Sequence, residues 1–127
     1  TIFVFIADLH EFIESVYQPK EDVIKIGPFV ENVMEKGSLH NIYFIAAVDT
    51  KDISFMRGSR AYEAMISYHT GIQLGGNAME AAYFDFSHLT YTEQNKGYKA
   101  GIGMIPRDND ESGVQKVIIP QYRKRDV

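Results

Sequence analysis

The residue best placed to do chemistry lies at the end of the first apolar run of the chain. Residues 2–6 (IFVFI) are continuously apolar, and Ala7 and Asp8 follow them. A short apolar strand that ends in an acid is how a parallel sheet delivers a carboxylate to the edge of a nucleotide site. The pattern G-x-x-x-x-G-K-[ST], which would hold the phosphates, occurs nowhere in the sequence. Asp8 is therefore a candidate nucleotide-site acid in a chain that has only the second half of such a site.

Three further residues are candidates for the same chemistry. Asp49 follows a second apolar run, residues 42–48, and is a candidate for the nucleotide-binding edge. The alternative for Asp49, which we favour, is a cap for the turn that follows. Arg57 and Arg60 flank Gly58 and Ser59 at the expected start of a helix, and they are candidates for an inter-subunit contact, a role that only the family resemblance given below implies. For this pair the favoured alternative is solvated surface arginines.

Composition and charge exclude several classes of protein. The 127 residues contain no cysteine, and the four histidines show no i,i+4 spacing, so we expect no metal site. The net charge of −4 argues against nucleic acid as a partner. No apolar stretch approaches the length of a membrane span and no signal-peptide pattern is present, so we expect a cytoplasmic chain without direct membrane insertion.

Apolar runs and helical periodicity alternate along the chain. Continuous apolarity in residues 2–6 and 42–48 indicates strands buried on both faces, as in a parallel sheet. Gly27-Pro28 predicts a helix start, Gly37 a helix cap, and Asn77 with Glu80 a capping box. The expected strands are 2–6, 42–48 and 71–76, the expected helices are 9–16, 28–36, 59–68 and 77–84, and 102–105 with 116–119 form a hairpin around the turn 107–113. The sequence thus predicts one α/β domain over 1–127, mainly parallel with crossover helices and a C-terminal β-hairpin.

Aromatic residues gather in the C-terminal half of the chain. They are expected to pack in the core and the hairpin, and the alternative is an exposed peptide-binding patch. The residues concerned are Tyr83, Phe84, Phe86, Tyr91 and Tyr98.

The order of these landmarks resembles the C-terminal part of an FtsK/SpoIIIE-type P-loop ATPase domain. It is most similar to the last ATPase domain of the EssC-like motor proteins of type VII secretion. The matching segments are FVFIADL at 3–9, the helix at 29–36 with the strand at 38–45, GIQLG at 71–75, and GYKAGIG at 97–103 with VIIP at 117–120. The resemblance implies a partial P-loop NTPase-like sheet without its Walker A segment.

The sequence departs from this family at the catalytic positions. An active Walker B strand ends in a magnesium-positioning aspartate followed by a second acid, but here the two positions hold Ala7 and Asp8. A register shift of one residue makes Asp8 the metal-associated acid and puts Leu9 in the catalytic position. The position that resembles the family's sensor holds Ala47, Val48 and Asp49. The resemblance therefore implies a catalytically silent module without a cofactor of its own, in a parent whose other domains bind ATP and Mg²⁺.

Three hypotheses about function follow. In the first, the chain is a non-catalytic part of a secretion motor at the cytoplasmic face of a membrane, and it recognises substrates or regulates export. Its partners would be the parent's other ATPase domains and a secreted protein or its helical signal. In the second, it is half of an active ATP-hydrolysing domain whose phosphate loop lies upstream. In the third, it is an unrelated small α/β domain, as expected if the first three strands are not adjacent and parallel. An exposed strand edge also predicts self-association.

Overall fold

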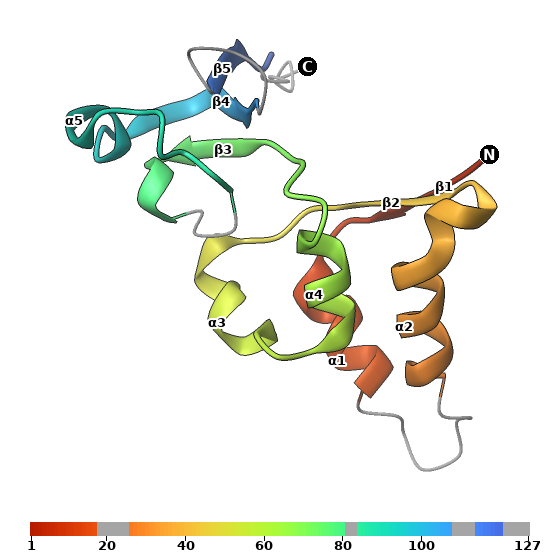
Figure 1. The fold of residues 1–127 in the computed structure, drawn as a ribbon. Coiled ribbons are helices and arrows are strands. Elements are labelled where there is room, and N and C mark those ends of the chain that lie inside the picture. Colours follow the sequence, from red (N-terminus) through yellow and green to blue (C-terminus); the bar gives the residue numbers. More distant parts are fainter. Residues whose placement is uncertain (18–25, 81–83, 108–113, 121–127) are drawn as a thin grey trace, which may run out of the picture. The chain divides into compact units, whose positions relative to one another are not determined.

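The computed structural model describes residues 1–17, 26–80, 84–107 and 114–120, which form a mixed α/β structure (Figure 1). The chain divides into two compact units, Thr1–Tyr68 (unit 1) and His69–Val127 (unit 2), and each is described by itself. The single domain expected over residues 1–127 stays a prediction.

Unit 1 is built on two parallel strands with helices on one side. Strand β1 (Ile2–Ile6) pairs in parallel with β2 (Ile42–Ala46), in register from Ile2 opposite Ile42 to Ile6 opposite Ala46. Figure 1 shows the helices of this unit on one side of the strand pair. The helices are α1 (Leu9–Tyr17), α2 (Gly27–Lys36), α3 (Ile53–Met56) and α4 (Arg60–Ile66), with short 3-10 helices at η1 (Gly37–His40) and η2 (Thr50–Asp52).

Helical periodicity explains how the core of unit 1 forms. In α1, Leu9, Ile13 and Val16 recur every three or four residues and are buried, so one stripe of the helix faces inward. Helix α4 begins after Ser59, whose hydroxyl accepts a hydrogen bond from the Tyr62 amide at 3.3 Å. Other buried side chains of this unit are Ile6, Met34, Ile53, Met56, Ala61, Tyr62 and Ala64.

The two strands and three helices expected in unit 1 are confirmed apart from details at their ends, and the short helices η2 and α3 were not expected. Gly37 is the C-cap residue of α2, as expected, but it is right-handed with φ −56°, and the chain continues into η1. The left-handed residue is Asn41, with φ 56°. Glycine suits position 37 for another reason: a Cβ there would lie 2.9 Å from the carbonyl oxygen of Ile42. The second detail is that β2 ends at Ala46, two residues earlier than expected.

Unit 2 is an antiparallel sheet of three strands. Strand β4 (Tyr98–Pro106) lies between β3 (Gln73–Gly76) and β5 (Val114–Ile118). The expected hairpin is confirmed, and residues 108–113 of its turn lie outside the described residues. Two short helices, η3 (Ala78–Glu80) and α5 (Tyr91–Gln94), complete the unit. Its buried core consists of Ala78, Phe86, Leu89, Met104 and Val114.

The expectation of a mainly parallel sheet is wrong for the strands that the structure describes. Only β1 and β2 are parallel, whereas β3 pairs antiparallel with β4 in a separate sheet. The pairing of β3 is irregular between Leu74 and Gly76, where Gly75 and Gly76 have φ of 66° and 65°. A four-residue strand with two glycines carries no side-chain pattern that could specify its partner. This topology meets the condition set for the third hypothesis, an unrelated small α/β domain. The parallel pairing of β1 and β2 is the part of the expected sheet that remains in agreement with the family resemblance.

The capping box is found at a different place from the one expected. The side-chain oxygen of Asn77 does not cap a helix, because Oδ1 is buried without a hydrogen-bond partner. The side-chain Nδ2 instead donates to Glu80 at 3.3 Å. The box forms at α5 instead, where the Thr90 hydroxyl accepts from the Glu93 amide and the Glu93 carboxylate accepts from the Thr90 amide. The helix expected over 77–84 is described only to Glu80, because 81–83 lie outside the described residues.

Candidate functional site

Asp8 lies at the carboxyl end of β1, where it caps helix α1. Its Oδ1 accepts a hydrogen bond from the Glu11 amide at 3.0 Å, and its carbonyl accepts from the Phe12 amide at 3.1 Å. These bonds satisfy backbone donors that the first turn of a helix leaves unpaired. Just beyond the strands, the Leu9 amide donates to the Ala47 carbonyl at 2.9 Å. The carboxylate of Asp8 is therefore fixed by a local structural role, although the residue is exposed.

Asp49 caps the next turn and forms an ion pair with Lys51. Its Oδ1 accepts from the Lys51 amide at 3.1 Å, and its Oδ2 lies 2.9 Å from the Lys51 Nζ. The bond from Lys51 lowers the pKa of Asp49, and the bond to Asp49 raises the pKa of Lys51. The structure thus shows the cap favoured from the sequence. A nucleotide-binding role for Asp49 stays a prediction.

The two acids follow adjacent parallel strands, so they lie at the same edge of the β1–β2 pair. The ammonium of Lys51 is the nearest counter-charge, and the charge of Asp8 also helps to raise the pKa of Lys51. In open α/β sheets this carboxyl edge is where ligands bind. Among the described residues, however, no three His, Asp or Glu side chains gather in a way that could hold a metal ion. The edge holds charged groups that already have partners within the chain.

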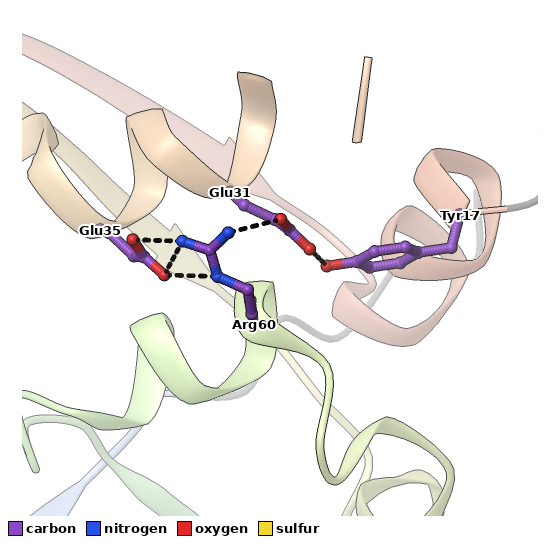
Figure 2. Close-up of polar contacts among 4 residues, drawn as sticks. All are labelled: Tyr17, Glu31, Glu35 and Arg60. Carbon is purple, nitrogen blue, oxygen red and sulfur yellow. Dashed lines mark hydrogen bonds and ion pairs between the residues drawn. The ribbon is translucent and has the colours of Figure 1, made fainter. Parts of the chain in front are cut away.

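Arg60 belongs to a polar network that connects three helices of unit 1 (Figure 2). Its guanidinium donates to both oxygens of Glu35 at 2.8 Å and to Glu31 Oε2 at 3.3 Å. The other oxygen of Glu31 accepts a hydrogen bond from the Tyr17 hydroxyl. Burial and the bond to Glu31 raise the pKa of Tyr17. The network thereby links α1, α2 and α4 through side chains.

The two arginines that were considered together in the sequence differ in their interactions. Arg60 is exposed at the surface, as favoured from the sequence, and its guanidinium also pairs with Glu31 and Glu35. Arg57 is exposed at the end of α3, and no interaction of its side chain is seen within the described ranges. An inter-subunit role for either residue stays a prediction. Sequence reasoning missed Tyr17 and Glu31, although two acids at i,i+4 on α2 were a signal that a cation is needed.

One face of the β1–β2 pair is apolar and exposed, contrary to the expectation of strands buried on both faces. Phe3 and Phe5 on β1 lie opposite Tyr43 and Ile45 on β2, and all four side chains point away from the covered side. The rings of Phe3 and Tyr43 are stacked with their centroids 5.7 Å apart. We call these four residues the open face. Its exposure follows from the placement of the helices of unit 1 on one side only (Figure 1).

The aromatic residues of unit 2 divide between core and surface. Phe86 is buried and meets Phe84 edge to face, with centroids 6.0 Å apart, and Tyr98 also packs against the core. Tyr91 is exposed, and Tyr83 lies outside the described residues. Core packing is thus confirmed for Phe84, Phe86 and Tyr98.

Comparisons with known proteins found no relative. No protein-family model matches the chain, and no curated protein or solved structure is similar enough to count as a match. The resemblance to the FtsK/SpoIIIE family therefore stays a prediction that rests on the motifs of the sequence. None of the helices in the described part of the chain has the length and apolarity needed to span a membrane.

Proposed function

We propose that this chain is a non-catalytic module of an FtsK/SpoIIIE-like motor of type VII secretion, acting in substrate recognition or in regulation of protein export. The observation that carries the proposal is the hydrogen bond from the Glu11 amide to the carboxylate of Asp8. The end of β1 supplies one acid only, and that acid serves as a helix cap, while Ala7 has no group that could position a metal.

The second strand strengthens the case against hydrolysis. An acid that orients water or positions magnesium must be available to its ligand. Asp49 instead has its own cation, Lys51, at 2.9 Å and also accepts the Lys51 amide. A ligand that used Asp49 would have to replace both interactions. The acids at the carboxyl edge of the strand pair therefore stabilise the turns of their own chain and are poorly suited to binding phosphates.

A binding role fits the surface of unit 1. Outside the open face, unit 1 also exposes large apolar side chains, among them Phe29 and Leu39, and exposed side chains of this kind are available to a protein partner. In the proposed setting, at the cytoplasmic face of a membrane, the partners are the parent's other ATPase domains and a secreted protein or its helical signal. Binding would regulate the motor if the module packs differently against the active domains in its two states.

The second candidate is half of an ATP-hydrolysing domain. The position of Asp8 and Asp49 at one carboxyl edge of a parallel pair favours it, because nucleotides bind at such edges. This candidate requires a G-x-x-x-x-G-K-[ST] loop upstream of the chain. Sequence that contained such a loop, next to a strand able to pair with β1, would support it.

Substitution of Asp8 separates the two candidates. In the complete protein, we expect Asp8→Asn to leave the rate of ATP hydrolysis unchanged, because asparagine keeps the cap and removes only the charge. Phosphate release at saturating ATP is the measurement. Loss of roughly 100-fold or more in rate would instead show that the charge acts in catalysis. As a structural control, Asp8→Ala removes the cap, and we expect it to lower the free energy of unfolding by about 1 kcal/mol.

A further inference from the structure

The open face is an apolar surface of unit 1 that no described element of this unit covers. Its four residues are exposed to 57% (Phe3), 74% (Phe5), 41% (Tyr43) and 50% (Ile45). On the opposite side of β1, exposure falls along the strand from 58% at Ile2 to 8% at Ile6. All ten residues of β1 and β2 are hydrophobic, so both sides of the pair have the composition of a buried layer. Parallel strands of this kind are normally covered on both faces.

We propose that the open face binds the same face of a second copy of the chain, forming a symmetric dimer. The face carries no charged side chain, so it is complementary to itself in the way that a two-fold interface requires. The dimer would pack one β1–β2 pair on another, as in the two layers of a β-sandwich. It does not depend on the proposed function, because no nucleotide or secreted partner takes part.

The area available fits a weak dimer. Because a fully exposed aromatic side chain presents roughly 200 Å², the four residues at these exposures offer about 400 Å² in each copy. Ala7 and Ala47 continue the same face by the two-residue period and are exposed. With them, the two copies bury about 1,000 Å² in total, near the lower limit of specific interfaces. Because buried area alone does not fix affinity, we expect only a weak dimer, with a dissociation constant below about 1 mM.

Electrostatics selects the relative direction of the two copies. Asp8 and Asp49 both lie at the carboxyl end of the strand pair. Packing with the strands of the two copies parallel would place these like charges near each other, at a cost in binding. Packing with the strands antiparallel puts the acidic ends at opposite ends of the interface. The antiparallel arrangement is therefore the one proposed.

Pairing through a strand edge is the competing mode of self-association. It would extend the sheet by backbone hydrogen bonds, but it would leave Phe3, Phe5, Tyr43 and Ile45 in water. Pairing through the face removes these side chains from water, and burial of apolar area is the dominant favourable term in protein association. The face is thus the better site for a second copy.

Sedimentation velocity over a range of chain concentrations tests the dimer. The structure offers a matched pair of variants: Phe5→Glu on the open face, and Phe55→Glu on α3, where the native residue is exposed to 75%. We expect wild type and Phe55→Glu to dimerise alike, and Phe5→Glu to raise the dissociation constant at least about 10-fold, since a charge buried at an interface is costly. Ile45→Glu on the neighbouring strand should act as Phe5→Glu does, and circular dichroism checks that each variant is folded.

Three results would overturn the proposal. The first is a chain that stays monomeric at concentrations well above the expected dissociation constant. The second is a dimer that Phe5→Glu and Ile45→Glu leave intact, which would indicate pairing through a strand edge. The third is equal dissociation by Phe5→Glu and Phe55→Glu, which would assign the effect to added charge rather than to the open face.

Discussion

Replacing Met56 by alanine is expected to lower the free energy of unfolding of unit 1 by about 3 kcal/mol. Met56 is exposed to 1% and is the largest fully buried side chain of this unit. It ends helix α3, which follows η2 and packs against α1. Truncation removes buried methylene groups and leaves a cavity that close-packed neighbours fill only in part. Both effects reduce stability, and neither depends on a ligand.

Urea denaturation followed by circular dichroism measures the effect of Met56→Ala, with Phe55→Ala as the control. Phe55 is the preceding residue of the same helix, is exposed to 75% and makes a ring contact by stacking on His10 of α1, so its truncation should cost less than about 1 kcal/mol. Equal losses for the two variants would contradict the packing of α3 described here.

Replacing Met104 by alanine should have an effect of similar size in unit 2. Met104 lies in the central strand β4 and is fully buried, in contact with a core that includes Phe86 and Leu89. We expect a loss of about 3 kcal/mol, seen as faster hydrogen exchange of the backbone amides in β3, β4 and β5. Strand β4 pairs on both sides, so weakening its core contacts should affect both ladders.

Ile118→Ala is the matched control for Met104→Ala, because Ile118 is on the neighbouring strand β5 and is exposed. Unchanged exchange in Met104→Ala would contradict a core centred on this side chain. The same exchange map tests the single-domain prediction: faster exchange that spreads to β1 and β2 would support it, and exchange confined to unit 2 would argue for two independent domains.

The sequence predicted the elements of unit 1 well, because its strongest signals are local and agree with each other. Continuous apolarity marked β1 and β2, the spacing of Leu9, Ile13 and Val16 marked α1, and the proline after Gly27 marked the start of α2. Each signal is set by neighbours within a few residues. The parallel pairing also followed, since a helical connection between two buried strands brings them side by side in that direction.

The features that the sequence did not predict depend on distant residues. Strand β3 pairs with β4, about 30 residues later, and its glycines carry no pattern that names this partner. Gly37 is the C-cap of α2 without the left-handed conformation that usually favours glycine, and the close approach of the Ile42 carbonyl explains why glycine suits this position. The capping box was expected at Asn77, whereas Thr90 and Glu93 form it in a segment where no helix was expected. The partner of β3, the requirement for glycine at position 37 and the place of the capping box all depend on tertiary packing.

The candidate site shows the same division. Its location at the ends of β1 and β2 could be predicted, because strand order places Asp8 and Asp49 at one edge. The hydrogen bonds that these carboxylates accept from the Glu11 and Lys51 amides could not be predicted, because they depend on the backbone geometry of the turns that follow. The contact between Tyr17 and Glu31 joins two helices and has no local signature.

Calorimetric titration of this chain with ATP in the presence of Mg²⁺ tests the central claim most directly. The account predicts no binding heat up to about 1 mM ATP, because the carboxyl edge lacks a phosphate loop and its two acids already have partners. The dimer proposed for the open face does not affect this result, since the face carries no polar group for a nucleotide. Saturable binding at micromolar concentration, lost in Asp8→Asn, would contradict the account and identify Asp8 as part of a nucleotide site.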